Sequence, residues 1–379
     1  NYLFPDAALK HAILDSGVTH LLVQPSDADR AEALLGDACP VLLTTGAGGS
    51  FAAAVAAQQP FDGVVPRLDG DEALIIYASG STGVPKGVRQ THRNTLAHCD
   101  AVIDHYQLTA DDHVLNCMPL FHVGGLQLSS LTLLLRGGQI TFMPKWDVTR
   151  WLELAQTLRP TFGGLISTMM IDVGNRTVQN PVVLDSFRIC MFGGSRTPTA
   201  AIERLAAGTG IQGTEIYGQT EQSGLVVTYA PGEQRRPNSM GRPLEQIVQT
   251  RLVPPGGGPD IRPGDEGVGE LWGRGDAVTL GYWNLDLPEK WATDETGTWL
   301  RTGDLMSIDA DGYLYYVDRI DDMIVSGGEN IFPQMVEEHL ADCSLIADVA
   351  VIGTPHERWV EQVTAIVVPN REGVTAADI

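Results

Sequence analysis

A loop of small, hydroxylated and basic residues has the composition of a phosphate-binding site. Residues 77–88 read YASGSTGVPKGV and combine glycines and hydroxyls with one lysine, Lys86. Glycines let the backbone approach an anion, N–H groups and hydroxyls donate hydrogen bonds to phosphate oxygens, and the lysine adds positive charge. The loop departs twice from the P-loop pattern G-x-x-x-x-G-K-[ST], because Pro85 stands at the second glycine and Gly87 at the hydroxyl position. A surface turn is the alternative, but the density of anion-binding groups favours a binding loop.

A second group of polar residues, 215–221 (EIYGQTE), could bind a nucleotide and a cation. Tyr217 offers a flat ring that can stack on a purine, and the hydroxyl of Thr220 can donate to a phosphate oxygen. Glu221 offers the oxygen ligand that Mg²⁺ takes together with phosphates. Solvated charges beside a strand are the alternative for Glu215 and Glu221, and the combined pattern makes that alternative weaker for Glu221.

The elements that must position these residues alternate between strands and helices. Short apolar or β-branched runs predict the strands, and helical periodicity predicts the helices. The strands are expected at 20–23, 74–77, 140–143 and 187–191, and the helices after Pro5 and at 91–106, 149–158 and 198–207. The loop at 77–88 is therefore expected between a strand and the helix that begins near Thr91. Such alternation is typical of α/β architecture with largely parallel strands.

The character of the chain changes near residue 240. From there to Val317, glycines and short β-like runs such as 269–272 and 313–317 predict a β-rich subdomain. After a charged junction at 318–322, a helix at 334–340 and strands at 349–352 and 363–368 predict a small α+β domain. We therefore expect an α/β protein. It has a large N-terminal domain of α/β subdomains (1–239) plus a β-rich subdomain (240–318), followed by a small mobile α+β C-terminal domain (319–379).

The loop at 77–88 resembles the phosphate-binding loop of the adenylate-forming superfamily, which includes acyl- and aryl-CoA ligases, peptide-synthetase adenylation domains and luciferases. Other segments resemble further motifs of that family, in its order: 118–125 (MPLFHVGG), 192–195 (FGGS), 215–221, 301–305 (RTGDL) and 318–324 (DRIDDMI). The resemblance covers nearly the whole chain. It implies an enzyme that uses ATP and Mg²⁺ to convert a carboxylic acid into an acyl-adenylate, releasing pyrophosphate, and then transfers the acyl group to the thiol of CoA.

The resemblance also implies roles for the matching residues. Catalysis falls to Thr82, Lys86, His122, Thr220 and Glu221, with Glu221 as the magnesium ligand. The contacts to ATP or AMP fall to Ser79, Gly80, Ser81, Thr82, Gly83, Lys86, Gly193, Gly194, Ser195, Glu215, Ile216, Tyr217, Gly218, Gln219, Thr220, Asp304 and Arg319. The acyl pocket is expected to include His122, Ile216, Gly218 and parts of Phe162–Met170, the hinge is Asp321, and the CoA tunnel is lined by Gly327 and Gly328.

Within this set, Asp304 is implied as the acceptor for both ribose hydroxyls. Residues 79–86, 217–221 and Asp304 are expected to converge around one ATP. The segments 269–275 (GELWGRG) and 281–284 (GYWN) match structural parts of the family pattern, and we assign them no chemistry.

The amino-acid composition limits the kinds of partner and cellular setting that we expect for the protein. The chain has 379 residues, with 25 Lys and Arg against 47 Asp and Glu, so its net charge of −22 makes nucleic acid and anionic membrane surfaces poor partners. The most apolar stretch, 126–135, is too short to span a bilayer, so no membrane insertion is expected. The five cysteines form no C-x-x-C pair, which favours a reducing, cytoplasmic setting over a zinc site or a disulfide framework.

Departures from the family pattern concern the ends of the chain. The family's small domain carries near its end a lysine that reaches the carboxylate and the α-phosphate, whereas no lysine follows Lys290 here. We also expect that the opening of the family's first subdomain is missing before Asn1. We expect a truncated body that binds nucleotide but forms adenylate poorly.

The leading interpretation is a free-standing acyl- or aryl-CoA ligase, because residues 326–333 (SGGENIFP) resemble CoA ligases of fatty and aromatic acids. An adenylation enzyme that loads the pantetheine arm of a carrier protein is the first alternative, since it would use the same core and hinge. A non-catalytic nucleotide-binding scaffold is the second.

Overall fold

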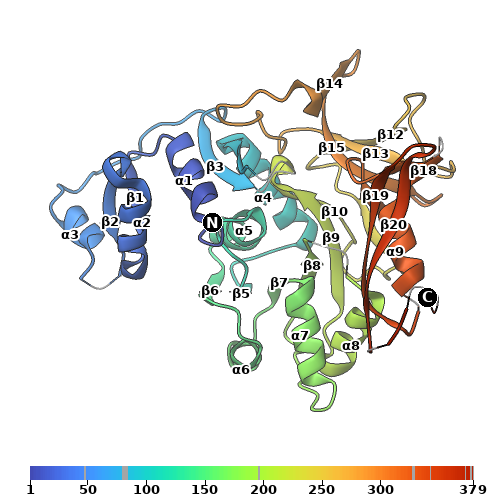
Figure 1. Ribbon diagram of the computed structural model, residues 1–379. Helices are drawn as coiled ribbons and strands as arrows, with labels where there is room; N and C mark the ends of the chain where they lie inside the picture. The colour runs from blue at the N-terminus through green and yellow to red at the C-terminus, as the bar shows by residue number, and fades with distance from the viewer. Residues whose placement is uncertain are drawn as a thin grey trace. The chain divides into compact units, whose positions relative to one another are not determined.

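The computed structural model describes residues 1–46, 48–78, 84–194, 197–326, 329–341, 343–371, 373–375 and 378 (Figure 1). Its chain divides into two compact units, each built from segments that are distant in sequence. The first unit comprises residues 1–164, 218–225 and 276–288, and the second comprises 165–217, 226–275 and 289–379. The chain passes between the units at Tyr217–Gly218, inside one of the predicted nucleotide-binding motifs. The domain boundaries expected at 239 and 318 stay predictions.

The first unit opens with a two-stranded parallel sheet and three helices. Strand β1 (His20–Val23) pairs with β2 (Val41–Thr44), and the helices are α1 (Asp6–Asp15), α2 (Ala28–Leu35) and α3 (Ser50–Ala56). Short 3₁₀ turns, η1 (Pro25–Asp27) and η2 (Gly36–Ala38), flank α2. The predicted strand at 20–23 and the helix after Pro5 are both confirmed.

The predicted phosphate loop connects two strands, which differs from the expectation. Strand β3 (Glu72–Ala78) pairs antiparallel with β4 (Lys86–Thr91), and Ala78 stands opposite Lys86. The helix α4 (His92–Tyr106) begins only after β4. The prediction of a loop that runs directly into a helix was wrong, because β4 buries polar residues as well as Val88 and so lacks an apolar alternation. Thr91 caps α4 reciprocally with Asn94, which explains why the start of the helix was predicted correctly.

The remaining strands of the first unit are parallel. Strand β5 (His113–Asn116) pairs with β6 (Gln139–Phe142) along its length and with β7 (Phe162–Ile166) at one position. Three helical segments accompany them: the π-helix η3 (Gly124–Leu131), α5 (Thr132–Arg136) and α6 (Val148–Leu158). The predicted strand at 140–143 and helix at 149–158 correspond to β6 and α6.

The second unit begins as α/β and continues as antiparallel β. Helices α7 (Ser167–Thr177) and α8 (Thr199–Thr209) lie side by side, and β8 (Ile189–Gly193) pairs parallel with β9 (Gly213–Gln219) (Figure 1). The sheet continues from β8 and β9 in the order β10, β11, β16, β15, β13, β12. These strands are β10 (Gly224–Thr228), β11 (Ser239–Pro243), β12 (Gln249–Val253), β13 (Gly269–Arg274), β15 (Gly297–Ile308) and β16 (Leu314–Arg319), with β14 (Trp291–Asp294) paired to β15. The 3₁₀ turn η4 (Thr220–Gln222) belongs to the first unit, and η5 (Pro288–Lys290) spans the point where the chain passes to the second. The expected β-rich stretch is confirmed.

The last part of the chain forms its own small sheet with one helix. The strand order is β18 (Glu329–Ile331), β17 (Ile324–Ser326), β20 (Val360–Pro369) and β19 (Ile346–His356), and all neighbours are antiparallel. Helix α9 (Pro333–Ala341) packs on β19, where the Glu337 carboxylate accepts a hydrogen bond from the Val351 N–H at 2.7 Å. This is the α+β arrangement that the sequence predicts after the charged junction.

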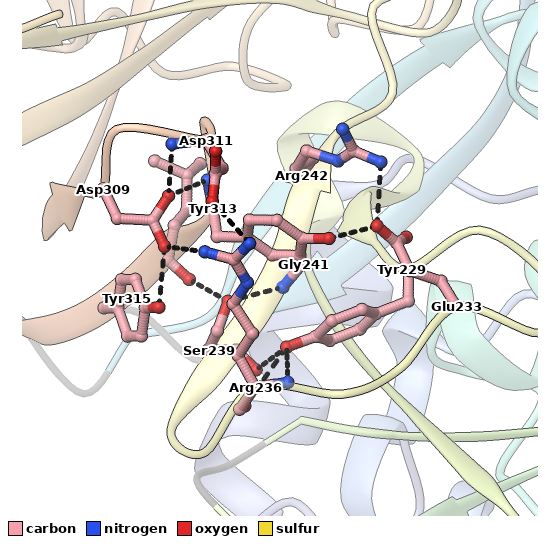
Figure 2. A network of polar contacts seen from close by, with 11 residues as sticks. Tyr229, Glu233, Arg236, Ser239, Gly241, Arg242, Asp309, Asp311, Tyr313 and Tyr315 are labelled. Atoms are coloured by element: carbon pink, nitrogen blue, oxygen red, sulfur yellow. Dashed lines mark hydrogen bonds and ion pairs between the residues drawn. The ribbon is translucent and has the colours of Figure 1, made fainter. Parts of the chain in front are cut away.

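A network of polar side chains joins the segment after β10 to the turn between β15 and β16 (Figure 2). Arg236 pairs with Asp309 at 2.7 Å and with Asp311 at 2.6 Å, and its guanidinium lies 3.8 Å above the ring centre of Tyr313. The Tyr313 hydroxyl donates in turn to Glu233. The network fixes the β15–β16 turn against β11, and β15 and β16 carry two of the candidate site residues.

Removing the Tyr229 hydroxyl should destabilise the second unit. Tyr229 is buried, and its hydroxyl lies 3.1 Å from the Ser239 carbonyl while it accepts from the Arg236 N–H at 3.1 Å. Tyr229→Phe leaves both backbone groups without this partner, so urea denaturation should show a loss of about 1–3 kcal/mol in the free energy of unfolding. The matched variant Tyr315→Phe removes a hydroxyl from a more exposed ring and should cost less. If the two variants lose the same free energy of unfolding, burial of the Tyr229 hydroxyl is not the reason for its contribution to stability.

Candidate functional site

The predicted ribose acceptor, Asp304, lies buried at the centre of a polar cluster in the second unit. Its Oδ2 accepts a hydrogen bond from the Tyr217 hydroxyl at 2.6 Å, and its Oδ1 accepts from the Arg319 guanidinium at 2.8 Å. Asp304 on β15 stands directly opposite Arg319 on β16 in the strand register. Three residues that were predicted from separate motifs therefore meet at one carboxylate, although 87 residues separate Tyr217 from Asp304.

The protonation states in this cluster follow from burial and charge. Burial raises the pKa of Tyr217 well above its ordinary value, and the adjacent Asp304 carboxylate raises it further, so the phenol stays a hydrogen-bond donor. Partial burial lowers the pKa of Arg319, but the charge and hydrogen bond of Asp304, together with Tyr316 and Tyr217, raise the pKa above its ordinary value. The cluster thus holds one carboxylate between a neutral phenol and a permanent cation.

Neighbouring residues of the second unit pack tightly around Ile216. A Cβ placed on Gly193 would lie 2.5 Å from the Ile216 Cγ1, so only glycine fits where β8 ends. Gly194 follows with a φ of +87°, a conformation that side chains disfavour. Glu215 is buried and forms an ion pair with Arg235, so it is not a solvated charge beside a strand.

Thr220 and Glu221 belong to the first unit, where neighbouring segments hold the backbone of both residues and the side chain of Glu221. The Thr220 carbonyl accepts a hydrogen bond from the buried Gln90 side chain at 2.7 Å. The Glu221 carbonyl accepts from the Thr279 N–H at 2.8 Å, and its Oε1 accepts from the Tyr282 hydroxyl at 2.8 Å. Gln90 is on β4, the strand that follows the predicted phosphate loop, so the loop's exit strand and the Thr220 turn are fastened together.

Gly218 has a backbone reason to be glycine. A Cβ at this position would lie 1.5 Å from the Gly224 carbonyl oxygen, so the side-chain direction is filled by the chain itself. The role of Gly218 in the acyl pocket stays a prediction.

Lys86 and His122 both lie in the first unit. Lys86 is the first residue of β4 and is half-buried, so it directly follows the predicted loop. The His122 ring packs edge-on against Phe121 with 4.7 Å between ring centres, and its reduced contact with solvent lowers its pKa. The predicted hinge, Asp321, lies exposed in the turn after β16.

Several predicted site residues fall outside the described residues: Ser79, Gly80, Ser81, Thr82, Gly83, Ser195, Gly327 and Gly328. Convergence of residues 79–86, 217–221 and Asp304 on one nucleotide stays a prediction.

The residues that the sequence interpretation missed are the ones that hold the candidate ligands in place. Gln90 supports Thr220, Tyr282 supports Glu221, and Glu270 contacts the turn before Asp304. Tyr282 and Glu270 lie in the two β segments to which we assigned no chemistry. The sequence signal that could have identified them is a polar residue within a predicted β segment. Such a residue, when buried, requires hydrogen-bond partners.

Glu221 fits a role as one ligand of a phosphate-bound Mg²⁺. Across the described residues, no three His, Cys, Asp or Glu side chains gather as a metal site. Mg²⁺ that accompanies nucleotide phosphates usually takes one or two carboxylates and retains waters, so a dedicated cage is not required. Tyr282 uses only one of the two Glu221 oxygens in its hydrogen bond, and it orients the carboxylate.

His98 gives the first unit a pH-dependent stability. The ring is fully buried and accepts a hydrogen bond from the Leu225 N–H at 2.9 Å, and burial lowers its pKa to about 3. Because an unfolded histidine titrates near pH 6.5, the unfolded chain binds more protons below that pH, and stability should fall as the pH drops from 6.5 toward 3.

Urea denaturation can isolate this contribution. Between pH 7.5 and 5.5, His98 alone should remove about 1.4 kcal/mol from the free energy of unfolding. His98→Gln keeps an acceptor for the Leu225 N–H but cannot titrate, so its loss over the same interval should be smaller by that amount. Identical pH profiles for the two proteins would show that the histidine is not kept neutral by the fold.

The helices provide no candidate for membrane insertion: across the described residues, none is both long and apolar enough to cross a bilayer.

Comparisons with known proteins identify the family of the chain. The family model described as AMP-binding enzyme matches residues 1–283, and that of the AMP-binding enzyme C-terminal domain matches residues 335–379. Feruloyl-CoA synthase from an Amycolatopsis species is 34% identical over 362 residues, which cover 95% of this chain and 71% of that protein.

Solved structures of CoA ligases match the fold of the chain. ATP-bound MatB from Rhodopseudomonas palustris matches with a TM-score of 0.87 at 26% identity, over 100% of this chain and 74% of that one. The o-succinylbenzoate CoA synthetase of Bacillus subtilis in complex with ATP and a magnesium ion matches with a TM-score of 0.81 at 25% identity, over 99% and 74% of the chains. The chain therefore belongs to the AMP-binding enzymes of the adenylate-forming superfamily, as an AMP-forming acid–thiol ligase of the acyl- and aryl-CoA ligase group.

Proposed function

We propose that this ligase activates an aromatic carboxylic acid for transfer to CoA and that Asp304 holds the ribose of its ATP. The observation that carries the ribose assignment is the buried contact between Asp304 and Tyr217. The aromatic assignment is supported by similarity to feruloyl-CoA synthase and to o-succinylbenzoate CoA synthetase. Asp321, Gly327 and Gly328 keep the hinge and tunnel roles that the family resemblance implies for them.

The Asp304 carboxylate is suited to a ribose because a carboxylate can accept hydrogen bonds from a pair of vicinal hydroxyls. The Tyr217 hydroxyl donates to its Oδ2 and the Arg319 guanidinium to its Oδ1. Arg319 neutralises the buried charge, and Tyr217 prevents the carboxylate from rotating.

The phosphates of ATP are assigned to Lys86, Thr220 and Glu221. Lys86 supplies positive charge, Thr220 a hydroxyl donor, and Glu221 a carboxylate for Mg²⁺. The bound Mg²⁺ supplies charge neutralisation at the phosphates. The hydrogen bonds from Gln90 to the Thr220 carbonyl and from Tyr282 to Glu221 keep these groups in fixed positions, which lowers the reorganisation needed during reaction.

The proposed chemistry has two balanced steps. A carboxylate oxygen of the acid forms a bond to the α-phosphorus while the bond to the bridging oxygen breaks, so that pyrophosphate leaves. The sulfur of CoA then attacks the acyl carbon, AMP leaves, and the thiol proton is lost. The protein's contribution is alignment of anionic reactants, and His122, Ile216 and Gly218 are proposed to border the acid. We place the reaction in the cytoplasm, where ATP and CoA are available.

An acid panel tests the substrate class. Purified protein is incubated with ATP, Mg²⁺ and CoA together with ferulate, benzoate, 2-succinylbenzoate, decanoate or hexadecanoate, and AMP and thioester are quantified separately. We expect the highest kcat/KM with an aromatic acid and equal yields of AMP and thioester. Asp304→Ala serves as the control for background hydrolysis.

Distinct results would contradict distinct parts of the proposal. Preference for decanoate or hexadecanoate would reject the aromatic class. Acylation of a carrier protein's pantetheine arm, with CoA left unmodified, would reject CoA as the acceptor. ATP binding without turnover of any acid would favour a non-catalytic nucleotide-binding scaffold.

A further inference from the structure

We propose that Glu270 is a positioning residue for nucleotide recognition, because it fixes the backbone bulge that presents Asp304. The inference rests on the proposed ribose role of Asp304. Glu270 lies on β13, in a segment to which the sequence gave us no reason to assign chemistry, and its side chain is only 4% exposed.

The bulge is an irregularity in the pairing of β13 with β15. Glu270 stands opposite Leu305 and Trp272 opposite Arg301, so the single residue between them on β13 faces the three residues 302–304. Bulges redirect side chains and are frequent beside functional sites. Asp304 is the last residue of this bulge, and its direction therefore depends on how the bulge is held.

The carboxylate of Glu270 binds the middle of the bulge. Its Oε1 accepts a hydrogen bond from the Gly303 N–H at 2.9 Å. Gly303 has a φ of +78°, a backbone conformation that favours glycine, and a Cβ there would lie 3.2 Å from the Arg319 guanidinium, which is a tight contact. An unbonded N–H in this turn would be buried without a partner and would favour a different turn.

The other carboxylate oxygen of Glu270 is fixed by two donors. Oε2 accepts from the Trp272 indole N–H at 2.8 Å and from the Arg301 Nε at 3.1 Å. Arg301 precedes the bulge in sequence, so Glu270 binds both the entry to the bulge and its centre. A charge-assisted contact to a backbone N–H is stronger than a neutral one.

Alternating arginine and tryptophan side chains extend from this point and keep the donors rigid. The Trp272 ring lies between Arg301 and Arg251, whose guanidinium carbons are 5.5 and 4.8 Å from its centre. Arg251 also lies 4.5 Å from the Trp299 ring centre, and Arg274 lies 4.5 Å from the same ring. Cation–π contacts of this kind stabilise an ordered stack, so the two donors to Oε2 have little freedom to follow a displaced carboxylate.

Three further hydrogen bonds connect the bulge to the backbone of Asp304 and to the residue after Arg319. The Thr302 hydroxyl donates to the Leu271 carbonyl at 2.6 Å and accepts from the Asp304 N–H at 3.0 Å. The Gly303 carbonyl accepts from the Ile320 N–H at 2.8 Å, next to Arg319. The backbone of the ribose-binding carboxylate and that of its arginine partner are thus both tied to Gly303, the residue that Glu270 holds.

The variant Glu270→Gln tests this role with little change of shape. The amide has one acceptor oxygen, whereas Gly303, Trp272 and Arg301 all donate toward the carboxylate, so either the bulge or the arginine loses its partner. The measurement is the equilibrium dissociation constant for ATP, 2′-deoxy-ATP and 3′-deoxy-ATP by calorimetric titration. The ratio of deoxy-ATP to ATP constants reports how well Asp304 meets the ribose hydroxyls, and a loss of thermal stability alone does not change it.

We expect Glu270→Gln to reduce this ratio by about tenfold, because a misplaced acceptor loses most of one charge-assisted hydrogen bond. The matched control is Asp309→Asn on the loop after β15, which removes the charge from a carboxylate that also binds backbone N–H groups and an arginine (Figure 2). Asp309→Asn should keep the parent ratio. If Glu270→Gln does not fold, Arg301→Lys, which keeps the charge but loses the guanidinium geometry, should give a smaller reduction of the same ratio.

The outcomes separate the two proposals. If Asp304→Ala keeps the parent ratio, the ribose role of Asp304 is wrong, whatever Glu270 does. If Asp304→Ala abolishes the discrimination while folded Glu270→Gln, or Arg301→Lys in its place, retains it, the ribose role stands and the positioning role of Glu270 is overturned.

Discussion

Asp304→Ala should bind ATP about 100- to 10,000-fold more weakly than the parent protein. Each hydrogen bond from a ribose hydroxyl to a charged acceptor contributes about 1.5–3 kcal/mol, and the variant loses two of them. The effect reaches beyond the ligand, because the buried Tyr217 hydroxyl and the Arg319 guanidinium lose their common acceptor. Calorimetric titration with ATP measures the loss directly.

Two variants show whether the loss comes from ribose recognition. Asp304→Asn keeps one acceptor oxygen and should retain part of the affinity, and Tyr217→Phe removes only the orienting hydrogen bond and should lose less than Asp304→Ala. The parent protein should prefer ATP over 2′-deoxy-ATP, and Asp304→Ala should bind both equally weakly. If Asp304→Ala still prefers ATP over 2′-deoxy-ATP as strongly as the parent protein does, Asp304 does not bind the ribose.

The parts of the fold that could be predicted from sequence are those whose signals are local. The helix at 92–106 has a reciprocal cap formed by Thr91 and Asn94. A cap of that kind depends on only four consecutive residues, so the local sequence is enough to indicate it. Strands β1 and β6 are short apolar runs bounded by turn residues, so their positions were also predicted. The change to β structure near residue 240 followed from glycine content and short apolar runs.

Strand β4 could not be predicted because its burial does not follow hydrophobicity. Gln90 and Thr91 are buried together with Val88, so the apolar alternation that identifies a half-buried strand is absent. The reason for burying Gln90 is its hydrogen bond to the Thr220 carbonyl, 130 residues away in the chain. A hydrogen-bond partner so distant in the sequence cannot be recognised from the residues around Gln90.

The candidate site shows the same division between local and long-range information. The family motifs predicted Tyr217, Asp304 and Arg319 as site residues. Only the structure shows that Tyr217 and Arg319 both contact the Asp304 carboxylate. Glu270 and Tyr282 were assigned no chemistry, because a residue that orients a ligand-binding group has no distinctive sequence of its own. Their contribution follows from contacts such as that of Glu270 with Gly303, 33 residues away.

Glu221→Gln should slow adenylate formation by about 100- to 1,000-fold, a loss typical of removing one electrostatic group from a transition state. The amide is a poorer ligand for Mg²⁺ than the carboxylate. The variant should therefore require a higher Mg²⁺ concentration for half-maximal ATP binding, and a titration of ATP binding against Mg²⁺ detects this without any turnover.

Tyr282→Phe resolves whether the carboxylate must also be oriented. The Tyr282 hydroxyl donates to the Glu221 Oε1 at 2.8 Å, and the ring is buried. Its removal leaves the charge of Glu221 in place but frees the carboxylate to rotate, so the Mg²⁺ requirement should rise by less than in Glu221→Gln.

Tyr315→Phe is the matched control, because it removes a hydroxyl that donates to another carboxylate, Asp309, in the second unit. A Mg²⁺ requirement that rises equally in Tyr282→Phe and Tyr315→Phe would show that orientation of Glu221 is not what the tyrosine contributes. A rise confined to Tyr282→Phe would mean that the fold fixes the metal ligand before nucleotide binds.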